Sequence, residues 1–316
     1  MTYNKESPTL ARRCPCRMPD TSYAAEPEIL VSSNSPAPGP AGETQPLVSV
    51  CIPSYNCESF IGQAIESVLA QTHRNVQLVI CDDCSSDGTV AVIQRYRDPR
   101  LRLIQNPKNL GIAGCWNEVL SQAQGKYIKF LCQDDYLHPD CLQEQTRILE
   151  DPQHRSVVMT FCRREIVGPD GRRIMTRGYS GNESVYRGVA MLRKSIRWGT
   201  NIIGEPGSVL FRAEVLPLVG NFAYVRPWII DLDFWSRILL LGDVYATRRP
   251  LCAFRVSAGS MSVYLQRIQA LEFCEFIDHL QADPRFQLRS LDCHVGRTMA
   301  HVNRFLRQVF YKFLLR

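Results

Sequence analysis

Two adjacent carboxylates, Asp134 and Asp135, directly follow an apolar run over residues 127–132 that is typical of a buried strand. Such neighbours repel each other, and burial disfavours their charged forms. A divalent cation offsets both effects, because Mg²⁺ or Mn²⁺ is commonly held by one or two carboxylates while water and substrate phosphates complete its coordination. The pair therefore predicts a metal-bridged phosphate site at the carboxyl edge of a sheet. A solvated Asp-Asp turn that leads into the next helix is the alternative.

A second acidic pair, Asp82 and Asp83, ends an earlier predicted strand at residues 76–81. In a parallel sheet both pairs lie at the same edge, where a carboxylate can accept hydrogen bonds from a ribose or a base. The sequence has no Walker P-loop, and no Gly-x-Gly-x-x-Gly follows the first predicted strand at residues 48–52. Phosphates must therefore be neutralised by other means, for which a bound metal is the obvious agent.

The elements that position these acids follow from the apolar pattern. Predicted strands alternate with predicted helices four times, the strands at residues 48–52, 76–81, 101–104 and 127–132 and the helices at 58–71, 89–96, 111–123 and 141–149. This alternation indicates an α/β fold with a Rossmann-like, mostly parallel sheet covered by helices on both faces. Further along, residues 244–247 and 251–256 predict a hairpin or strand pair. Residues from 295 onward predict a helix with an apolar stripe at Met299, Val302, Leu306, Val309 and Phe313.

Composition limits the classes of protein that this chain can represent. Its 316 residues, 45% hydrophobic and 22% charged, are ordinary for a globular protein. Residues 1–46 are rich in Pro, Ser, Ala and Gly, which indicates a disordered arm. The 13 cysteines lack zinc-ligand spacing and mostly lie in apolar strand patterns, so a reducing compartment is expected. There is no secretory signal and no apolar run that could span a bilayer, so we expect a cytoplasmic protein.

The net charge of +6 comes from the C-terminus. Residues 284–316 carry seven basic residues and one acid, and the difference accounts for the whole excess. The rest of the chain is neutral, which argues against a general nucleic-acid-binding surface on the main domain. Arg163 and Arg164, like Arg248 and Arg249, are expected to be solvated surface charges, with contact between one of them and a phosphate as the alternative.

Four motifs, taken together and in this order, resemble those of the family 2 glycosyltransferases, which have the GT-A fold. They are Val48–Asn56, Ile80–Gly88, Asn109–Gly111 with Asn117, and Gln133–Asp135. The resemblance covers residues 47–262, and it is specific because several separate motifs agree in order.

The resemblance implies where a nucleotide-sugar and a metal would bind. Residues implied to hold the nucleotide-sugar are Pro53, Tyr55, Asn56, Asp82, Asp83, Asn109, Gly111, Asn117 and Asp134. Among them Asp83 is implied to contact the base, and Asp134 faces the ribose or sugar. Asp135, with Asp134, is implied to hold the Mn²⁺ or Mg²⁺ that bridges the diphosphate.

The resemblance also implies a catalytic base and an acceptor side. Asp231 takes the position of the base, which would remove the proton from the attacking hydroxyl group. Two residues depart from the family pattern: Ile230 stands where a Glu is usual, and Ser257 stands where members often have His. Residues implied on the acceptor side are Glu205, Pro206, Asp233 and Trp235. For Asp233 a plain first-turn acid is an equal alternative, and for Trp228 and Trp235 packing is as plausible as stacking on a sugar.

These expectations describe an inverting, metal-dependent glycosyltransferase with a UDP-sugar as its first candidate donor and a dTDP-sugar as its second. The acceptor would be a hydroxyl of a glycan or lipid-linked molecule, in bacterial surface polysaccharide synthesis. We expect the arm at 1–46, a GT-A domain at 47–260 and a basic helical extension at 261–316. Within the domain, 47–136 would bind the nucleotide and 137–260 the acceptor. The extension would dock on the domain or lie on the inner face of an anionic membrane.

Two other functions remain open from the sequence. A sugar-nucleotide nucleotidyltransferase has a related sheet, but it would need a Gly-rich basic loop after the first strand, and residues 53–56 do not form one. A non-catalytic nucleotide-sugar or carbohydrate binder is supported only by the departures at Ile230 and Ser257. Detection of a transferred sugar would separate that binder from the enzyme.

Overall fold

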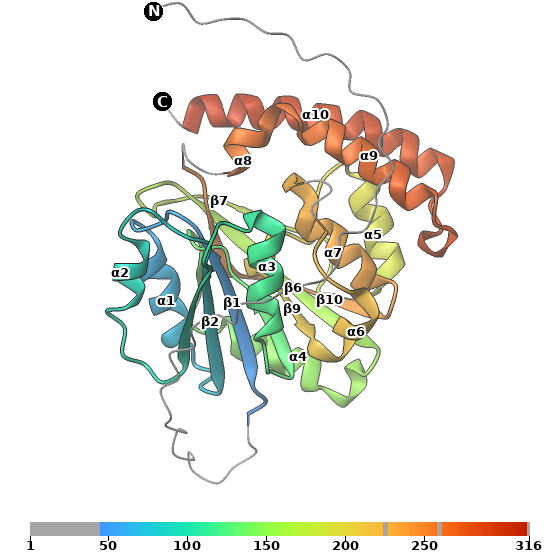
Figure 1. Cartoon of the computed structure of the whole chain (residues 1–316). Helices are drawn as coiled ribbons and strands as arrows, with labels where there is room; N and C mark the ends of the chain where they lie inside the picture. Colours follow the sequence, from blue (N-terminus) through green and yellow to red (C-terminus); the bar gives the residue numbers. More distant parts are fainter. Residues whose placement is uncertain (1–44, 224–226, 258–260, 315–316) are drawn as a thin grey trace, which may run out of the picture.

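Figure 1 shows the computed structural model, which describes residues 45–223, 227–257 and 261–314. The predicted arm at 1–46 lies outside the described residues except for its last two. In the described part, ten strands form one sheet in the order β3-β2-β1-β4-β9-β6-β10-β5, with β7 on β6 and β8 on β10. The strands are β1 (Val48–Ser54), β2 (Val76–Asp82), β3 (Leu101–Gln105), β4 (Tyr127–Phe130), β5 (Tyr136–Leu137), β6 (Val157–Val167), β7 (Arg173–Arg177), β8 (Ser184–Arg187), β9 (Val209–Arg212) and β10 (Asp243–Arg255).

Helices cover the sheet and extend beyond it (Figure 1). They are α1 (Ile61–Leu69), α2 (Thr89–Ile93), α3 (Gly111–Ser121), α4 (Cys141–Glu150), α5 (Gly188–Arg197), α6 (Leu216–Val219), α7 (Ile230–Leu239), α8 (Met261–Tyr264), α9 (Gln269–Gln281) and α10 (Ser290–Leu314). Two short 3-10 helices, η2 (Pro206–Ser208) and η4 (Pro227–Ile229), lie at the site described below.

The first four strands of the chain form the parallel half of the sheet. β1 pairs in parallel with β2 and with β4, and β2 pairs in parallel with β3. Their carboxyl ends therefore meet at one edge, as the alternating pattern predicts. The other half is mixed, because β9 enters antiparallel between β4 and β6 while β10 runs parallel to β6.

The predicted hairpin over residues 244–256 is instead one continuous strand, β10, so that expectation is wrong. Its register against β6 shifts between Ala246 and Pro250 and again between Pro250 and Cys252. Pro250 has no N–H to donate to a ladder and is tolerated at such irregularities. The break lets one strand pair with β8 through residues 243–246 and with β5 through residues 252–253.

The core has two layers, one on each face of the sheet. Along β1, Val48, Val50 and Ile52 pack into the layer under α1 and α4, whereas Cys51 packs into the layer with α3, α5 and α7. Successive strand side chains point to opposite faces. Because both faces are covered, β1 is buried along nearly its whole length and is mostly apolar, as is typical of a parallel strand buried between helices.

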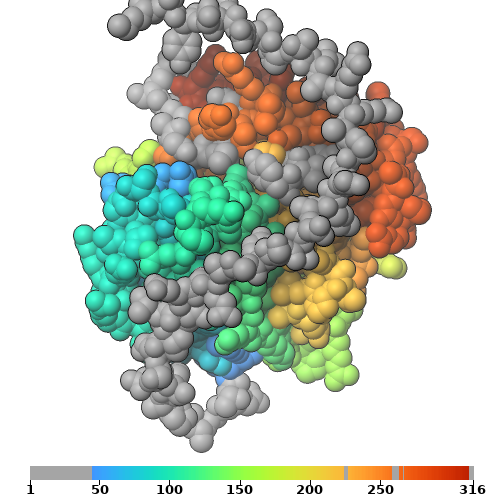
Figure 2. Space-filling view, viewed as in Figure 1, coloured from blue at the N-terminus to red at the C-terminus, as the bar shows by residue number. Residues whose placement is uncertain are grey.

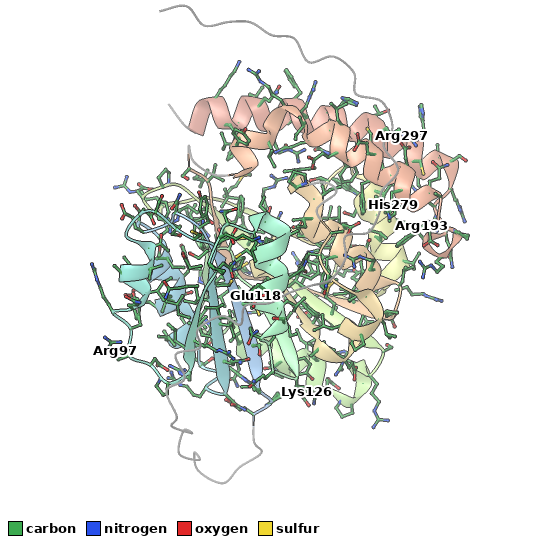
Figure 3. The ribbon with its side chains drawn as sticks, viewed as in Figure 1. Arg97, Glu118, Lys126, Arg193, His279 and Arg297 are labelled. Carbon is green, nitrogen blue, oxygen red and sulfur yellow. The ribbon has the colours of Figure 1, made fainter. Side chains whose placement is uncertain are left out.

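The C-terminal helices lie over the carboxyl edge of the sheet. Figure 2 shows α9 and α10, in orange and red, as the upper part of the molecule. An ion pair joins α5 to α10, with Arg193 Nη2 2.9 Å from Asp292 Oδ2, and Figure 3 shows Arg193 at the same corner as His279 and Arg297. Asn303 Nδ2 donates to the Trp198 carbonyl oxygen at 2.6 Å. The extension is thereby docked on the main domain.

Candidate active site

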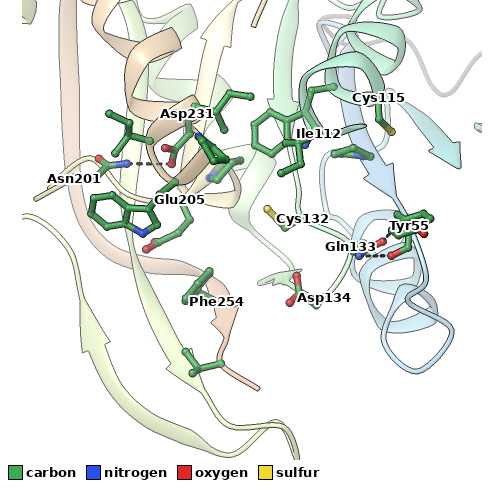
Figure 4. Close-up of a pocket in the computed structure, with 18 of the residues that line it drawn as sticks. Tyr55, Ile112, Cys115, Cys132, Gln133, Asp134, Asn201, Glu205, Asp231 and Phe254 are labelled. Carbon is green, nitrogen blue, oxygen red and sulfur yellow. Dashed lines mark hydrogen bonds between the residues drawn. The ribbon is translucent and has the colours of Figure 1, made fainter. Parts of the chain in front are cut away.

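A cavity of about 690 Å³ opens where the carboxyl ends of the parallel strands meet the C-terminal helices. It is lined by residues of both halves of the sheet and by α10. In Figure 4, Tyr55, Gln133 and Cys115 lie at one end, and Asn201, Glu205 and Asp231 lie at the other. Cys132 and Asp134 lie between them. The cavity thus has two chemically different ends with an acid in the middle.

The loop after β1 is held at the first end by a side-chain clamp. Gln133 Oε1 accepts from the Tyr55 amide at 2.6 Å, and Gln133 Nε2 donates to the Tyr55 carbonyl oxygen at 3.0 Å. Tyr55 remains 48% exposed and lines the cavity. Asn56 adopts a positive φ of 47° and receives the Ser86 amide on its side-chain oxygen. The clamp therefore presents an exposed aromatic ring on a fixed backbone, which suits stacking on a flat ligand group.

Asp83 organises the loop that precedes α3. Its carboxylate accepts hydrogen bonds from Asn106 Nδ2 (2.8 Å), the Leu110 amide (2.8 Å) and the Gly111 amide (3.0 Å). Asn109 Nδ2 donates to the Asp83 carbonyl oxygen at 3.1 Å. These hydrogen bonds offset the cost of burying the Asp83 carboxylate and at the same time order residues 106–111. Asp83, Asn109 and Gly111 all line the cavity.

Arg255, at the end of β10, fixes the turn that carries the acidic pair. Its amide donates to Asp135 Oδ1 at 2.9 Å, and its Nε donates to the Asp134 carbonyl oxygen at 2.9 Å. Burial raises the pKa of Asp134, and burial together with the neighbouring Asp134 charge raises the pKa of Asp135. The carboxylate charges are therefore only partly compensated, as expected of a site that receives a cation.

Asp231 lies in the first turn of α7 and faces the second end of the cavity. Asn201 Nδ2 donates to its Oδ2 at 3.1 Å, and the Leu232 amide donates to its Oδ1 at 2.7 Å. Burial raises the pKa of Asp231 to about 7, and the negative charge of Glu205 contributes to the shift. A carboxylate with a pKa near the working pH is suited to accept a proton from a substrate.

Glu205 and Arg164 form an ion pair beside Asp231. Arg164 Nη2 donates to Glu205 Oε1 at 3.1 Å, and Nε also contacts the carboxylate. Arg164 is 3% exposed, so the expectation that it is a solvated surface charge is wrong. Arg164 lies on β6, and its side chain points toward the cavity. Two adjacent arginines in the sequence do not indicate which way either side chain points.

The sequence profile described as Glycosyl transferase family 2 matches residues 49–216, more than half of the chain. The chain belongs to this family. Its members are glycosyltransferases, and this protein is accordingly a glycosyltransferase.

Named relatives and solved structures agree with the assignment. The chain is 40% identical over 219 residues to the Escherichia coli UDP-Glc:alpha-D-GlcNAc-diphosphoundecaprenol beta-1,3-glucosyltransferase WfaP, covering 68% of this chain and 80% of WfaP. The structure of S. aureus TarS 1-349 in complex with UDP-GlcNAc superimposes with a TM-score of 0.60 at 21% identity, covering 81% and 72% of the two chains. The mannosyltransferase PcManGT from Pyrobaculum calidifontis, in complex with GDP-Man and Mn²⁺, gives 0.58 at 19% identity, covering 81% and 70%. The predicted α/β GT-A fold is confirmed.

The glycosyltransferase brings ten of the predicted site residues together around one cavity. They are Pro53, Tyr55, Asn56, Asp83, Asn109, Gly111, Asp134, Glu205, Pro206 and Asp231. They come from six separate stretches of the chain. The parallel register of β1, β2 and β4 aligns at one edge those that follow these three strands.

Five other predicted residues do not line this cavity. Asp82 accepts from the Ser85 amide and hydroxyl, and Asn117 exchanges two hydrogen bonds with the backbone of Phe222, so both shape loops. Asp135 is 2% exposed, and its carboxylate accepts the hydrogen bond from the Arg255 amide. Asp233 pairs with Arg237 one turn later on α7 at 3.1 Å.

Trp235 is the clearest correction among the predicted acceptor residues. Its side chain is 0% exposed and packs against Phe211 and Phe234 in the core. On α7 it lies four residues after Asp231, but its ring enters the core layer under the sheet. Trp235 is therefore close to the proposed base Asp231 in sequence but does not line the cavity.

The sequence analysis missed the contribution of α10 to the glycosyltransferase cavity. Arg307, Phe310 and Tyr311 line it, and the Arg307 guanidinium lies 4.7 Å from the ring centre of Trp228. Asn201, which orients Asp231, and Gln133, which clamps Tyr55, were also missed as site residues. The basic charge of the C-terminus was the available signal, but it does not say which face of the helix meets the cavity.

The protein side chains alone make an incomplete metal site. Among residues 45–223, 227–257 and 261–314, no three His, Cys, Asp or Glu side chains converge on one point. Two adjacent carboxylates are nevertheless a donor set that fits a hard divalent cation whose remaining ligands are phosphate oxygens and water.

Within the described part of the chain, no helix is both long and apolar enough to cross a membrane.

Proposed function

We propose that this glycosyltransferase transfers a sugar, with inversion, from a nucleoside-diphosphate donor to a hydroxyl group of a glycan or lipid-linked acceptor. A UDP-sugar is the first candidate donor and a dTDP-sugar the second. The names of two similar proteins support a UDP-sugar: WfaP is a UDP-Glc glucosyltransferase, and TarS binds UDP-GlcNAc. We further propose a role in bacterial surface polysaccharide synthesis, which the name of another similar protein supports: ExoO of Rhizobium meliloti is a succinoglycan biosynthesis protein.

The two ends of the cavity suit the two substrates. We assign the end with Tyr55, Asp83 and Asn109, built by residues 47–136, to the nucleotide. We assign the end with Glu205 and Asp231, built by residues 137–260, to the acceptor. The exposed Tyr55 ring offers a stacking surface, whereas the second end offers a proton acceptor. Helix α10 belongs to the extension at 261–316 and closes the acceptor end.

Asp231 carries the proposed reaction. Its carboxylate takes the proton from the acceptor hydroxyl as that oxygen attacks the anomeric carbon, on the face opposite to the leaving diphosphate. Asn201 donates a hydrogen bond to Oδ2 of Asp231 and so keeps the Asp231 carboxylate oriented toward the cavity. No covalent intermediate is needed, because attack and departure occur on opposite faces of the sugar. The pKa of about 7 keeps a useful fraction ionised at neutral pH while making the base stronger than an exposed aspartate.

Asp134 and Asp135 are the residues that would hold the divalent cation, Mn²⁺ or Mg²⁺. When bound, such a cation offsets the charge that develops on the leaving diphosphate. The Mn²⁺ complex of PcManGT supports the use of a divalent ion in this fold. Arg255 keeps the turn in place through the Asp134 carbonyl oxygen and the Asp135 carboxylate.

We also propose that the enzyme acts in the cytoplasm, with peripheral contact to the inner face of the membrane through α10. That helix exposes Phe305, Leu306 and Val309, and Lys312 beside them is also exposed. An exposed apolar stripe flanked by basic residues suits an anionic lipid surface.

The test compares Asp231→Asn with Asp233→Asn, a matched change two residues later on the same helix. UDP release from UDP-Glc with acceptor, and UDP binding by calorimetry, are measured for both. We expect Asp231→Asn to lose about 10²–10⁴-fold in turnover because the general base is removed, while UDP binding persists. Asp233→Asn should retain most of its turnover. Equal turnover by Asp231→Asn and the parent enzyme would contradict the role of Asp231, and UDP binding without any sugar transfer would favour a non-catalytic binder.

A further inference from the structure

Three arginines from distant parts of the chain meet at the acceptor end of the cavity. Arg164 comes from β6, Arg177 from the end of β7 and Arg307 from α10, and all three line the cavity. Arg307 Nη1 lies 3.4 Å from the Thr200 hydroxyl, next to Asn201, and Arg164 is paired with Glu205. We call Arg164, Arg177 and Arg307 the arginine cluster.

The arginine cluster carries more positive charge than its surroundings compensate. Glu205 pairs with Arg164, but no salt bridge joins Arg177 or Arg307 to an acid in the described part of the chain. There, too, Arg164 Nη1 and Arg307 Nε and Nη2 are buried without a hydrogen-bond partner. Burial lowers the pKa of Arg307 to about 10, so it remains charged at neutral pH. Buried donors that lack partners are costly, and an anion placed among them would supply acceptors.

The surface beside the cluster is apolar. Ile166, Val256 and Tyr311 form a small buried group against which Phe254 and Phe310 pack, and all five line the cavity. A ligand that fits both features has a phosphate next to a hydrocarbon chain. A free sugar phosphate would use the cluster but leave this apolar wall uncovered.

We propose that the arginine cluster binds the phosphate or diphosphate that joins the acceptor sugar to an apolar carrier. This inference rests on the proposed function and identifies its acceptor as an anionic, lipid-linked sugar. WfaP is named for a diphosphoundecaprenol-linked acceptor, which is the same chemical class.

The position of the cluster favours the acceptor phosphate over the donor diphosphate. In an inverting transfer the leaving diphosphate lies across the anomeric carbon from the base. The cluster lies instead on the side of the base. Arg307 contacts Thr200, the neighbour of Asn201 in the chain, and Arg164 contacts Glu205. Asn201 and Glu205 lie at the same end of the cavity as Asp231 (Figure 4). Asp134, which we assign to the donor, lies toward the middle.

The experiment titrates geranyl diphosphate, a short isoprenoid diphosphate, into the full chain saturated with UDP and Mg²⁺, by calorimetry. Geraniol, which lacks the phosphates, is titrated in parallel. The variants are Arg177→Gln, Arg307→Gln, Arg307→Lys and the control Lys312→Gln, which removes a charge from an exposed position of α10 outside the cavity. UDP binding is measured for every variant as a check of the fold and of the donor end.

We expect the parent enzyme to bind geranyl diphosphate but not geraniol. Arg177→Gln and Arg307→Gln should each weaken that binding by at least about tenfold, since each removes charge-assisted hydrogen bonds. Arg307→Lys should recover part of the loss, and Lys312→Gln should bind as the parent does. UDP binding should be unchanged throughout.

Three results would overturn the proposal. They are no binding of geranyl diphosphate to the parent enzyme, equal binding of geraniol, and a loss of UDP affinity in the arginine variants as large as the loss of geranyl diphosphate affinity. The last result would assign the cluster to the donor. Failure of the proposed function itself has another signature, namely intact geranyl diphosphate binding by an enzyme that never releases UDP from a UDP-sugar.

Discussion

Asp231 shows how local surroundings turn a common side chain into a candidate base. An exposed aspartate has a pKa of about 4 and accepts protons weakly at neutral pH. Here burial and the nearby Glu205 charge raise the pKa, and the hydrogen bond from the Leu232 amide and the positive charge of Arg164 limit the rise. The family pattern has Glu before this position, and the buried Ile230 adds to the apolar surroundings instead.

The pH dependence of the reaction should report this shift. Because the base must be ionised to accept a proton, kcat/KM should fall as the pH drops below about 7 and level off above it. Asn201→Asp preserves the shape of the side chain but faces Asp231 with a second carboxylate. The repulsion should move the acid limb up by roughly one pH unit or more. Initial rates between pH 5 and 9, a range of about two units either side of neutrality, measure both profiles.

An acid limb near pH 4, an aspartate's ordinary value of about 3.9, would show that Asp231 does not titrate as the base. A limb that stays in place in Asn201→Asp would show that Asn201 does not contact the titrating group. UDP binding in the variant serves as the control, because the nucleotide end of the cavity is remote from Asn201 in Figure 4.

At the scale of elements, strand β10 holds the turn of Asp134 and Asp135 in place through the side chain of Arg255. The buried Arg255 guanidinium donates to the carbonyl oxygens of Asp134, Gly168 and Pro169 and to the side chain of Gln63. It therefore connects α1, the acidic turn and the turn between β6 and β7. Carbonyl groups that lose such a donor inside a protein stay unsatisfied, and each costs free energy.

Arg255→Met should destabilise the protein and loosen the acidic turn. We expect the free energy of unfolding to fall by about 3 kcal/mol, since several buried acceptors lose their donor at once. Arg248→Met, at an exposed position of the same strand, should have little effect. Urea unfolding of both variants measures the change. Equal stabilities would show that the Arg255 side chain does not hold the turn.

At the scale of the whole molecule, the docking of α10 completes the cavity. Helix α10 approaches α5 closely, since a Cβ at Gly296 would lie 2.5 Å from the Ile196 carbonyl oxygen. The predicted apolar stripe is only partly docked: Met299 lies against Gly199, whereas Val302, Leu306 and Val309 are exposed. Ala300 and Tyr311 are buried instead. Small residues at the contact let the two backbones pack, which in turn brings Arg307 and Tyr311 to the cavity.

Gly199→Ala should disturb this docking. Gly199 has φ +61°, and an added Cβ would lie 2.3 Å from the Ala300 amide nitrogen. Gly220→Ala is the matched control, because Gly220 has φ +69° with nothing within 4 Å of an added Cβ. Backbone strain alone should cost Gly220→Ala about 1–3 kcal/mol, because its φ of 69° and ψ of −158° lie in a region that is almost confined to glycine. Gly199→Ala should lose roughly 1–3 kcal/mol more, in the range of overpacking.

Urea unfolding measures both glycine variants, and limited proteolysis reports whether α10 has been released. Equal losses of stability would mean that the contact between Gly199 and α10 contributes nothing beyond backbone conformation. Early cleavage within α10 in Gly199→Ala alone would show that docking, rather than the turn, is what the added methyl group disturbs.

The sequence by itself determined the fold class, the family and the acidic residues of the cavity. Strand periodicity and strand-end acids are local patterns, and parallel pairing brings the ends of successive strands to one edge whatever else the chain does. Asp83 and Asp134 were therefore identifiable before any coordinates, and Asp231 was identifiable through the family resemblance. Their motifs lie within short windows, in which neighbouring residues set both conformation and chemistry.

The tertiary structure alone decided which side chains of the later elements face the cavity. Trp235 and Asp233 lie on the same helix as Asp231 but point elsewhere, whereas Arg164, Arg177 and Arg307 converge from three distant elements. Such placement depends on helix rotation and on close backbone contacts between residues about a hundred positions apart, such as Gly199 with Ala300. Those contacts result from many small packing energies across the whole core, which no local pattern records.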